Sequence, residues 1–289
     1  MFQKFFDFLI YSNLYIGTAS VLMTVESQIQ LGMKPTWHPY LFLILFATLF
    51  EYNLHKFVSV FFYKHSLKET KFHWISEHLR LFYFIVFASV AGFLIAAWFA
   101  KISVLITLFP LGAITFLYSF PVYKNGVKLF RLREVPLVKI FIISFIWSAT
   151  CIVLPIVQAD LKISIPVVLL LITERALFIF AITVPFDIRD MASDARSGLK
   201  TLPLLIGEKN AIRVANIALI GFILACSVHY FYTMEIDLLA AFFISGITTL
   251  YFLNNERIKQ LKEYHYGVLD GTMLLQGALV ILFYMINNR

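Results

Sequence analysis

The sequence predicts an all-α fold, a polytopic membrane bundle of nine transmembrane helices that forms one domain over residues 1–289. Hydrophobic residues make up 60% of the chain and charged residues only 14%, and the mean hydropathy is +0.82. Soluble domains contain about 25% charged residues, and so little polar material cannot cover a soluble surface. Nine apolar runs are long enough to span a bilayer. These observations exclude a soluble enzyme, a nucleic-acid-binding protein and a disordered chain.

The expected spans follow one another through short connections. A membrane-spanning helix needs about 17–25 mostly apolar residues. The first run lacks a small-residue cleavage site, so we expect a retained helix rather than a signal peptide. The third and fourth runs are separated only by the segment AKIS around Lys101. Cys151 and Cys226 lie in apolar runs, where we expect buried packing residues. The nine expected spans cover residues 8–29, 39–62, 79–99, 102–121, 135–157, 163–186, 211–232, 236–253 and 267–286.

The distribution of Lys and Arg between these spans predicts the orientation. With the N-terminus in the cytoplasm, 18 of the 24 basic residues fall on the cytoplasmic side and four on the outer side. This asymmetry follows the rule that cytoplasmic loops are rich in Lys and Arg. We therefore expect an integral, multi-pass protein, of a bacterial inner membrane, with its N-terminus in the cytoplasm and its C-terminus outside. The longer connections are cytoplasmic, so we expect the functional surface there.

The most informative stretch is VPFDIRDMASDARSGLKTLPLLIGEKNA, residues 184–211, at the cytoplasmic end of the sixth span. Asp187, Asp190 and Asp194 fall within a sector of roughly 60° around a helix. Carboxylates that share a face repel one another unless a cation lies between them. Mg²⁺ prefers oxygen ligands and bridges them to phosphates. The spacing therefore indicates a Mg²⁺–diphosphate clamp, and the alternative is a polar helix end that happens to be acidic.

The basic residues near this motif have less specific expectations. Arg189 and Arg196 lie about 180° from the acidic face, so we expect them to set the topology or contact lipid headgroups. Gly198 is expected to end the helix. Lys200 follows in a loop, where it either turns back to neutralise a diphosphate or stays in solvent.

This stretch resembles the second aspartate-rich motif of the UbiA-type intramembrane prenyltransferase family. The matching features are the pattern Asp-x-x-Asp-x-x-x-Asp, Gly198, the run KTLP at residues 200–203, and Gly207. The segments FLYSFPVYK (116–124) and LREVPLVKIFIISFIWS (132–148) are similar to the family's Tyr-Ser-x-Pro stretch and the helix after it. The resemblance covers most of the chain. It implies transfer of an isoprenyl group from an allylic diphosphate to an acceptor, with Mg²⁺ as cofactor.

The family's first motif is degenerate here. That motif begins with Asn and continues with Asp residues at spacings of four on the second span. Asn53 matches, but Phe57 and Phe61 stand where the acids would be. Lys56 lies about 60° from Asn53 around the helix. Three roles are open to it: contact with the diphosphate, an ion pair with the second motif, or extension of its ammonium group toward the interface.

Ionisable residues also occur deep in the expected bundle. Glu174 and Arg175 lie about 18–20 Å beyond Asp187 along the sixth span, where a charged side chain is costly and indicates function. Arg175 could bind the carboxylate of an aromatic acceptor, or both residues could belong to a buried network. Asp270 at the start of the ninth span could join the acidic clamp or interact with the helix dipole.

Together these features predict a membrane prenyltransferase. Asp187, Asp190 and Asp194 are expected to hold Mg²⁺ and to carry catalysis. The expected partners are a prenyl diphosphate donor, an unidentified acceptor and the lipid bilayer, and not nucleic acid. The expected substrate-binding residues are Asn53, Lys56, Lys139, Lys200 and Arg175.

Two other functions stay open. A non-catalytic family member that binds a prenyl lipid is favoured by the missing acids of the first motif. A transporter is favoured by Glu174 and Arg175 in mid-membrane, but the sequence lacks paired broken helices in two matching halves.

Overall fold

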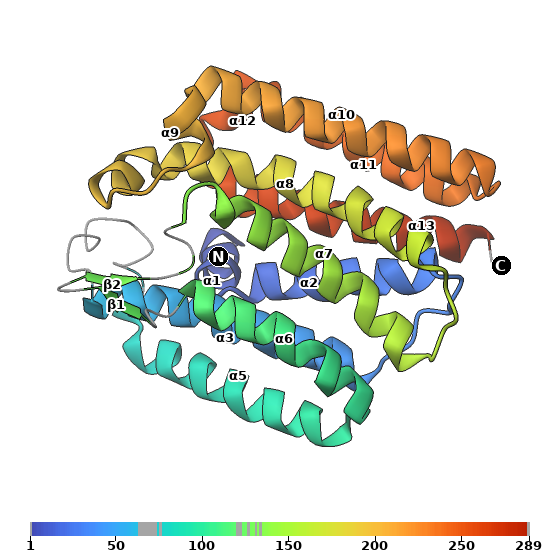
Figure 1. The fold of residues 1–289 in the computed structure, drawn as a ribbon, viewed down its shortest axis with the longest axis horizontal. Helices are drawn as coiled ribbons and strands as arrows, with labels where there is room; N and C mark the ends of the chain where they lie inside the picture. The colour runs from blue at the N-terminus through green and yellow to red at the C-terminus, as the bar shows by residue number, and fades with distance from the viewer. Residues whose placement is uncertain are drawn as a thin grey trace.

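The computed structural model describes residues 2–62, 74, 77–119, 123–125, 128–130, 132 and 135–287. Helices make up nearly all of this part of the chain (Figure 1). A two-stranded antiparallel ribbon, with Tyr123 opposite Phe130, is the exception among these residues. The elements are α1 (Phe2–Tyr11), α2 (Leu14–Gln30), α3 (Pro39–Phe62), α5 (Leu79–Phe99), α6 (Ile102–Ser119), β1 (Tyr123–Asn125), β2 (Lys128–Phe130), α7 (Val138–Gln158), α8 (Ile165–Arg196), α9 (Leu202–Ile206), α10 (Glu208–Tyr232), α11 (Ile236–Asn254), α12 (Glu256–Lys259), η3 (Tyr264–Leu269) and α13 (Asp270–Asn287).

The predicted all-α, polytopic membrane class is confirmed, but the count of nine spans is not. Within the described residues, seven helices are long and apolar enough to cross a membrane. The pair α1 and α2 bends by 71° and would be an eighth span if it crosses as one unit. Within α3, the segment Pro39–Leu54 forms a shorter apolar helix, so the ninth span stays a prediction.

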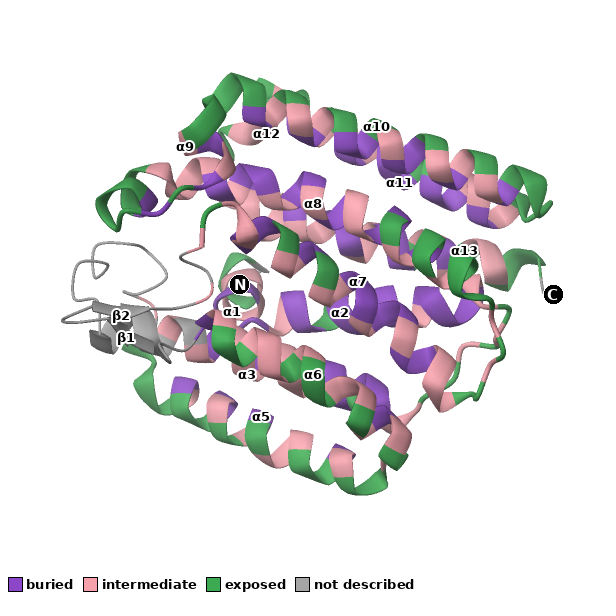
Figure 2. Ribbon diagram, viewed as in Figure 1, coloured by how far each residue is buried: buried purple, intermediate pink, exposed green. Residues whose placement is uncertain are grey.

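Four central helices organise the bundle. Helix α2 packs against α13 and α7, and α8 packs against α7 and α10 (Figure 1). Helices α10 and α11 form one edge of the bundle and α5 forms the opposite edge. Buried residues are concentrated on the central helices (Figure 2). The main hydrophobic core includes Met23 of α2 and Phe178 of α8, together with Phe222 and Tyr230 on the inner face of α10. All four are almost fully buried.

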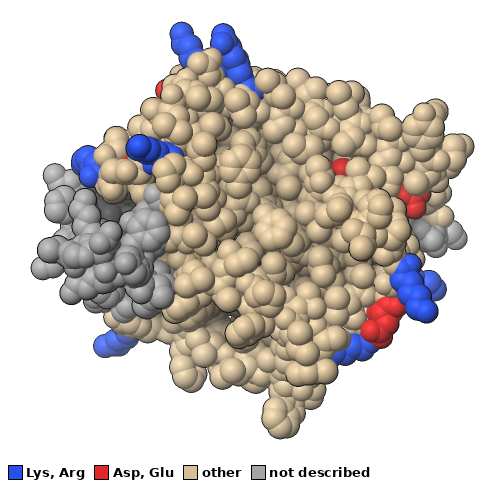
Figure 3. Space-filling model, in the orientation of Figure 1, with Lys and Arg blue, Asp and Glu red and all other residues tan. Residues whose placement is uncertain are grey.

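On the face shown in Figure 3, charged side chains are few, and most Lys and Arg side chains lie away from its middle. Large apolar side chains such as Phe84, Phe87 and Trp98 of α5 are exposed. An exposed apolar belt of this kind suits lipid rather than water. The chain is therefore a multi-pass integral membrane protein.

The connections expected in the cytoplasm share one end of the bundle. The ribbon β1–β2, helix α9 and helix α12 all lie there, and the C-terminus lies at the other end (Figure 1). Gly198, two residues beyond the end of α8 at Arg196, has φ +72°, so the helix ends there as predicted, in a conformation that favours glycine. The acidic motif is thus placed on the last turns of α8, at the end with the longer connections.

Candidate functional site

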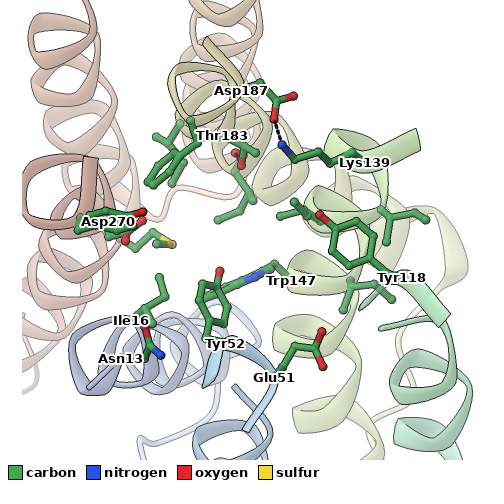
Figure 4. A pocket seen from close by; sticks show the side chains of 18 of the residues that line it. Asn13, Ile16, Glu51, Tyr52, Tyr118, Lys139, Trp147, Thr183, Asp187 and Asp270 are labelled. Carbon is green, nitrogen blue, oxygen red and sulfur yellow. Dashed lines mark hydrogen bonds and ion pairs between the residues drawn. The ribbon is translucent and has the colours of Figure 1, made fainter. Parts of the chain in front are cut away.

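A cavity of about 290 Å³ opens among the central helices near the acidic motif. Much of its wall is apolar, with Ile143, Ile146, Ile179, Ile182 and Met273 among the lining side chains. Asp187 and Lys139 lie on one side of the cavity, and Tyr52, Trp147 and Glu51 lie across from them (Figure 4). This division suits a ligand with an apolar chain and an anionic head.

Asp187 and Lys139 form the most buried charged pair of the cavity. Helices α7 and α8 pack together and bring the two side chains toward each other (Figure 4). The Lys139 Nζ atom lies 2.6 Å from Asp187 Oδ1 and 3.4 Å from Asp194 Oδ2. The Asp187 side chain is 1% exposed and that of Lys139 is 11% exposed. One lysine therefore neutralises two of the three aspartates of the motif in part.

Asp190 has a different basic partner. Arg189, its neighbour in the chain, places Nε 2.8 Å from Asp190 Oδ1 and Nη2 3.1 Å from Oδ2. The Arg189 guanidinium also lies 4.8 Å from the centre of the Tyr266 ring. Arg189 and Asp190 both line the cavity. The prediction that Arg189 points away from the acidic face is therefore wrong, because its long side chain reaches around the helix to its neighbour Asp190.

The three aspartates do not form a ready metal clamp. The described residues contain no group of three or more His, Cys, Asp and Glu side chains that could hold one ion. In proteins Mg²⁺ often binds through one or two carboxylates, with phosphates and waters as its other ligands. Among the described residues, no hydrogen-bond donor reaches Asp187 Oδ2, which is buried. Asp187 Oδ2 could therefore serve as a ligand of one Mg²⁺ ion. The assignment of Asp187, Asp190 and Asp194 together as Mg²⁺ ligands stays a prediction.

Asn53 and Lys56 form hydrogen bonds with the residues that connect α1 to α2. The Lys56 Nζ atom donates to Tyr11 O and to Asn13 Oδ1, at 2.8 Å each. The Asn53 side chain accepts a 2.9 Å hydrogen bond from Asn13 Nδ2 and donates to Ser12 O at 3.3 Å. These contacts satisfy backbone carbonyls that the end of α1 leaves without helical partners. Lys56 lines the cavity, whereas Asn53 is buried behind the wall and does not line it.

Arg175 lies outside the cavity, in a buried network. Its Nη2 atom is 2.6 Å from Glu26 Oε1, and the guanidinium also donates to Gln30 and to Met23 O. Gln276 Nε2 donates to the same Glu26 oxygen at 3.0 Å. Of the two interpretations of Arg175, the buried network matches these contacts, and the acceptor-binding role has no support from its position.

Two other predicted features lie away from the cavity or outside the described part. Lys200 is exposed in the loop after α8, where its backbone oxygen accepts a 3.1 Å hydrogen bond from Leu137 N. Its side chain is not among those that line the cavity. The side chains of Phe57 and Phe61, which replace the acids of the first motif, lie outside the described residues.

Several cavity residues were missed by the sequence reasoning. Glu51 accepts a hydrogen bond from the Ser119 hydroxyl, and it lines the cavity on the side away from Asp187 (Figure 4). Tyr52 and Trp147 contribute aromatic side chains to the same wall. The sequence did carry one signal for Glu51 and Tyr52: they come directly before Asn53, the residue that matches the family's first motif. Asp270, which the sequence left between two roles, lines the cavity near the acidic motif.

About two thirds of the chain matches a known protein family. Residues 76–264 match the profile of the UbiA prenyltransferase family. No curated protein sequence matches significantly.

Solved structures share the fold along nearly the whole chain. The structure of a UbiA homolog from Archaeoglobus fulgidus bound to GPP and Mg²⁺ has a TM-score of 0.64 at 12% identity, over 96% of this chain and 99% of that one. The apo structure of a UbiA homolog from Aeropyrum pernix K1 has a TM-score of 0.63 at 13% identity, over 94% and 96%. A structure of digeranylgeranylglyceryl phosphate synthase has a TM-score of 0.56 at 15% identity, over 98% of each chain.

Proposed function

This chain belongs to the UbiA prenyltransferase family, and on that basis we propose that it transfers a prenyl group from an allylic diphosphate to an acceptor inside the bilayer. One observation carries the proposal. The Lys139–Asp187 ion pair lies in the wall of a cavity whose remaining surface is largely apolar. A prenyl diphosphate has the matching division into an anionic head and an apolar chain.

The proposed reaction exchanges one bond at the first carbon of the prenyl chain. The bond between that carbon and the diphosphate oxygen breaks, and the diphosphate leaves with the electron pair. An electron pair of the acceptor forms the new bond, and the acceptor's proton passes to the released diphosphate. The protein must therefore stabilise negative charge on the leaving group and positive charge on the prenyl carbon.

Basic side chains of the cavity stabilise the leaving group in this proposal. Lys56, Lys139 and Arg189 all line the cavity and carry positive charge. Charge-assisted contacts to phosphate are strong because donor and acceptor are both ionised. Mg²⁺, when bound at Asp187 with Asp190 and Asp194 as candidate further ligands, would supply additional positive charge at the same oxygens.

Aromatic and aliphatic side chains protect and stabilise the prenyl carbon. Tyr52 and Trp147 offer ring faces, whose negative potential attracts a cation. Ile143, Ile179 and Ile182 exclude water, which would otherwise capture the prenyl cation. The acceptor is unidentified, and Glu51 offers it a carboxylate on the side of the cavity away from Asp187.

A non-catalytic, prenyl-lipid-binding role is the second candidate. Phe57 and Phe61 replace the first-motif acids, which favours it because fewer ligands are then left for metal ions. Such a protein would bind the donor without breaking its carbon–oxygen bond.

Binding and turnover of GPP separate these functions. We expect the purified protein, with Mg²⁺ present, to bind GPP more tightly than geraniol, the uncharged alcohol with the same chain. Pyrophosphate release should require an acceptor-containing lipid extract. It should be lost in Asp190→Asn and kept in the control Asp160→Asn, whose exposed carboxylate pairs with Lys101 at 2.7 Å. Equal affinity for GPP and geraniol would overturn the prenyl diphosphate proposal, and binding without release would favour the non-catalytic role.

A further inference from the structure

Lys139 occupies an unusual place for a lysine in a membrane bundle. It is the second residue of α7, and its side chain is only 11% exposed. Its ammonium group lies between Asp187 and Asp194, which are seven residues apart on α8 and therefore nearly in line along one face. The side chains of these two aspartates are 1% and 6% exposed. Buried carboxylates so close together need a cation between them.

The charges of the motif are balanced largely by the protein itself. Lys139 contacts Asp187 and Asp194, and Arg189 contacts Asp190 through both carboxylate oxygens. Among the described residues, each of the three aspartates thus has a basic side chain in contact with it. A divalent ion that bridges Asp187 and Asp194 would have to displace the Lys139 ammonium group. This displacement lowers the affinity for the ion, compared with a site that has the same aspartates but no lysine.

We infer that Lys139 is a resident cation of the diphosphate site, which takes the place of a metal ion between Asp187 and Asp194. In this arrangement the two aspartates are positioning residues that hold the ammonium group at the cavity wall. The diphosphate then binds between Lys139 on α7 and Lys56 on α3, with room for one Mg²⁺ at Asp187 Oδ2. The identity of the ligand, a diphosphate, rests on the proposed function. The exclusion of a metal ion by Lys139 does not rest on it.

Two observations distinguish this role from a purely structural ion pair. Lys139 and Asp187 line the cavity, whereas the buried pair Arg175–Glu26 does not. The sequence also lacks the first-motif acids, with Phe57 and Phe61 in their places. A site with fewer acids requires fewer metal ions, and a built-in ammonium group supplies part of the missing positive charge.

Thermal unfolding with Mg²⁺ alone tests the exclusion of metal, without any diphosphate. The wild-type melting temperature in detergent should change little between EDTA and millimolar Mg²⁺, because the one position left at Asp187 Oδ2 needs diphosphate oxygens as further ligands. Lys139→Met should lower it in EDTA by roughly 6 °C or more, because two buried carboxylates lose their cation. Mg²⁺ should restore much of that loss in Lys139→Met, but not in Lys139→Met/Asp194→Asn. The control Lys101→Met removes an exposed ion pair and should show no Mg²⁺ dependence.

Two results of that experiment would overturn the inference. One is a Lys139→Met protein that Mg²⁺ does not stabilise. The other is a wild-type protein that Mg²⁺ stabilises as strongly as the variant. Neither result depends on whether the protein is a prenyltransferase.

Pyrophosphate binding to the wild-type protein gives a second measurement, which applies even if Lys139→Met does not fold. Inorganic pyrophosphate should bind in EDTA with an affinity within about a hundredfold of that in Mg²⁺, since the loss of one charge-assisted contact costs roughly ten- to a hundredfold. Binding that requires Mg²⁺, or no binding at all, would contradict the role of Lys139. GPP binding in Mg²⁺ remains the separate test of the proposed function.

Discussion

The ammonium nitrogen of Lys56 lies 2.8 Å from the side-chain oxygen of Asn13, the residue at which the chain turns by 71° between α1 and α2. Asn13 has φ 65°, a left-handed conformation that interrupts the helix. The Lys56 ammonium group also donates a hydrogen bond to Tyr11 O at the end of α1. The side chain that the sequence singled out for the diphosphate therefore also fixes the bend in the first span.

Replacing Lys56 should reduce stability as well as ligand binding. Lys56→Met removes two charge-assisted hydrogen bonds but keeps the apolar part of the side chain. We expect the free energy of unfolding to fall by at least about 1.5–3 kcal/mol, since a single hydrogen bond to a charged group contributes about that much. Thermal unfolding of Lys56→Met, Asn13→Ala and the double variant measures it. The losses should be clearly less than additive, and strict additivity would mean that the two side chains do not depend on each other.

Arg175 should matter for stability and not for the ligand. Removing one partner of a buried ion pair leaves an uncompensated charge, which costs about 3–5 kcal/mol. We therefore expect Arg175→Met to unfold at a much lower temperature than wild type, and Glu26→Gln/Arg175→Met to recover part of the loss. GPP affinity, measured below the melting temperature, should be unchanged. A variant of normal stability that loses affinity for substrate would restore the acceptor-binding interpretation.

Arg189 should contact the diphosphate, and Arg196 provides a matched control. Arg189 lines the cavity, whereas Arg196 is exposed at the end of α8 and donates to Ala192 O. We expect Arg189→Gln to weaken GPP binding roughly ten- to a hundredfold, which corresponds to one charge-assisted contact. Arg196→Gln should bind normally. Equal effects of the two substitutions in calorimetry would show a general electrostatic contribution instead of a contact.

The orientation in the membrane can be tested by cysteine labelling. Lys162 and Gln260 are exposed in connections at opposite ends of the bundle, and the natural residues Cys151 and Cys226 are buried. An impermeant maleimide should label Lys162→Cys in intact cells, and Gln260→Cys only after permeabilisation, as the positive-inside rule predicts. The reverse pattern would place the acidic motif on the outer side.

The fold class was readable from composition because a bilayer imposes long apolar helices. The end of α8 at Gly198 was also readable, since a glycine after a helix favours the left-handed conformation. The bend at Asn13 was not, because its stabilising partners Asn53 and Lys56 lie about 40 residues further along the chain. Only tertiary packing brings such residues together.

The site was predicted in part. Two of the three aspartates singled out by their helical spacing, Asp187 and Asp190, line the cavity, and their role as Mg²⁺ ligands stays a prediction. Their partners were less accessible, because Lys139 comes from another helix and Arg189 folds back onto its own. A helical wheel assigns each residue a direction from its Cα atom, but the long side chain of Arg189 reaches the next residue, which lies about 100° around the helix. The partner of Arg175, Glu26, lies 149 residues away in the chain, so no local pattern could identify it.

The pairing of Glu26 with Arg175 has a consequence for a protein in an energised membrane. A transmembrane voltage does work of about 2.3 kcal/mol per elementary charge per 100 mV on a charge that crosses the whole field. Glu26 and Arg175 carry opposite charges 2.6 Å apart, so the forces on them nearly cancel. The fold should therefore be equally stable in polarised and depolarised membranes. Neutralising either residue alone would leave one uncompensated charge within the field and make the stability of the bundle depend on voltage.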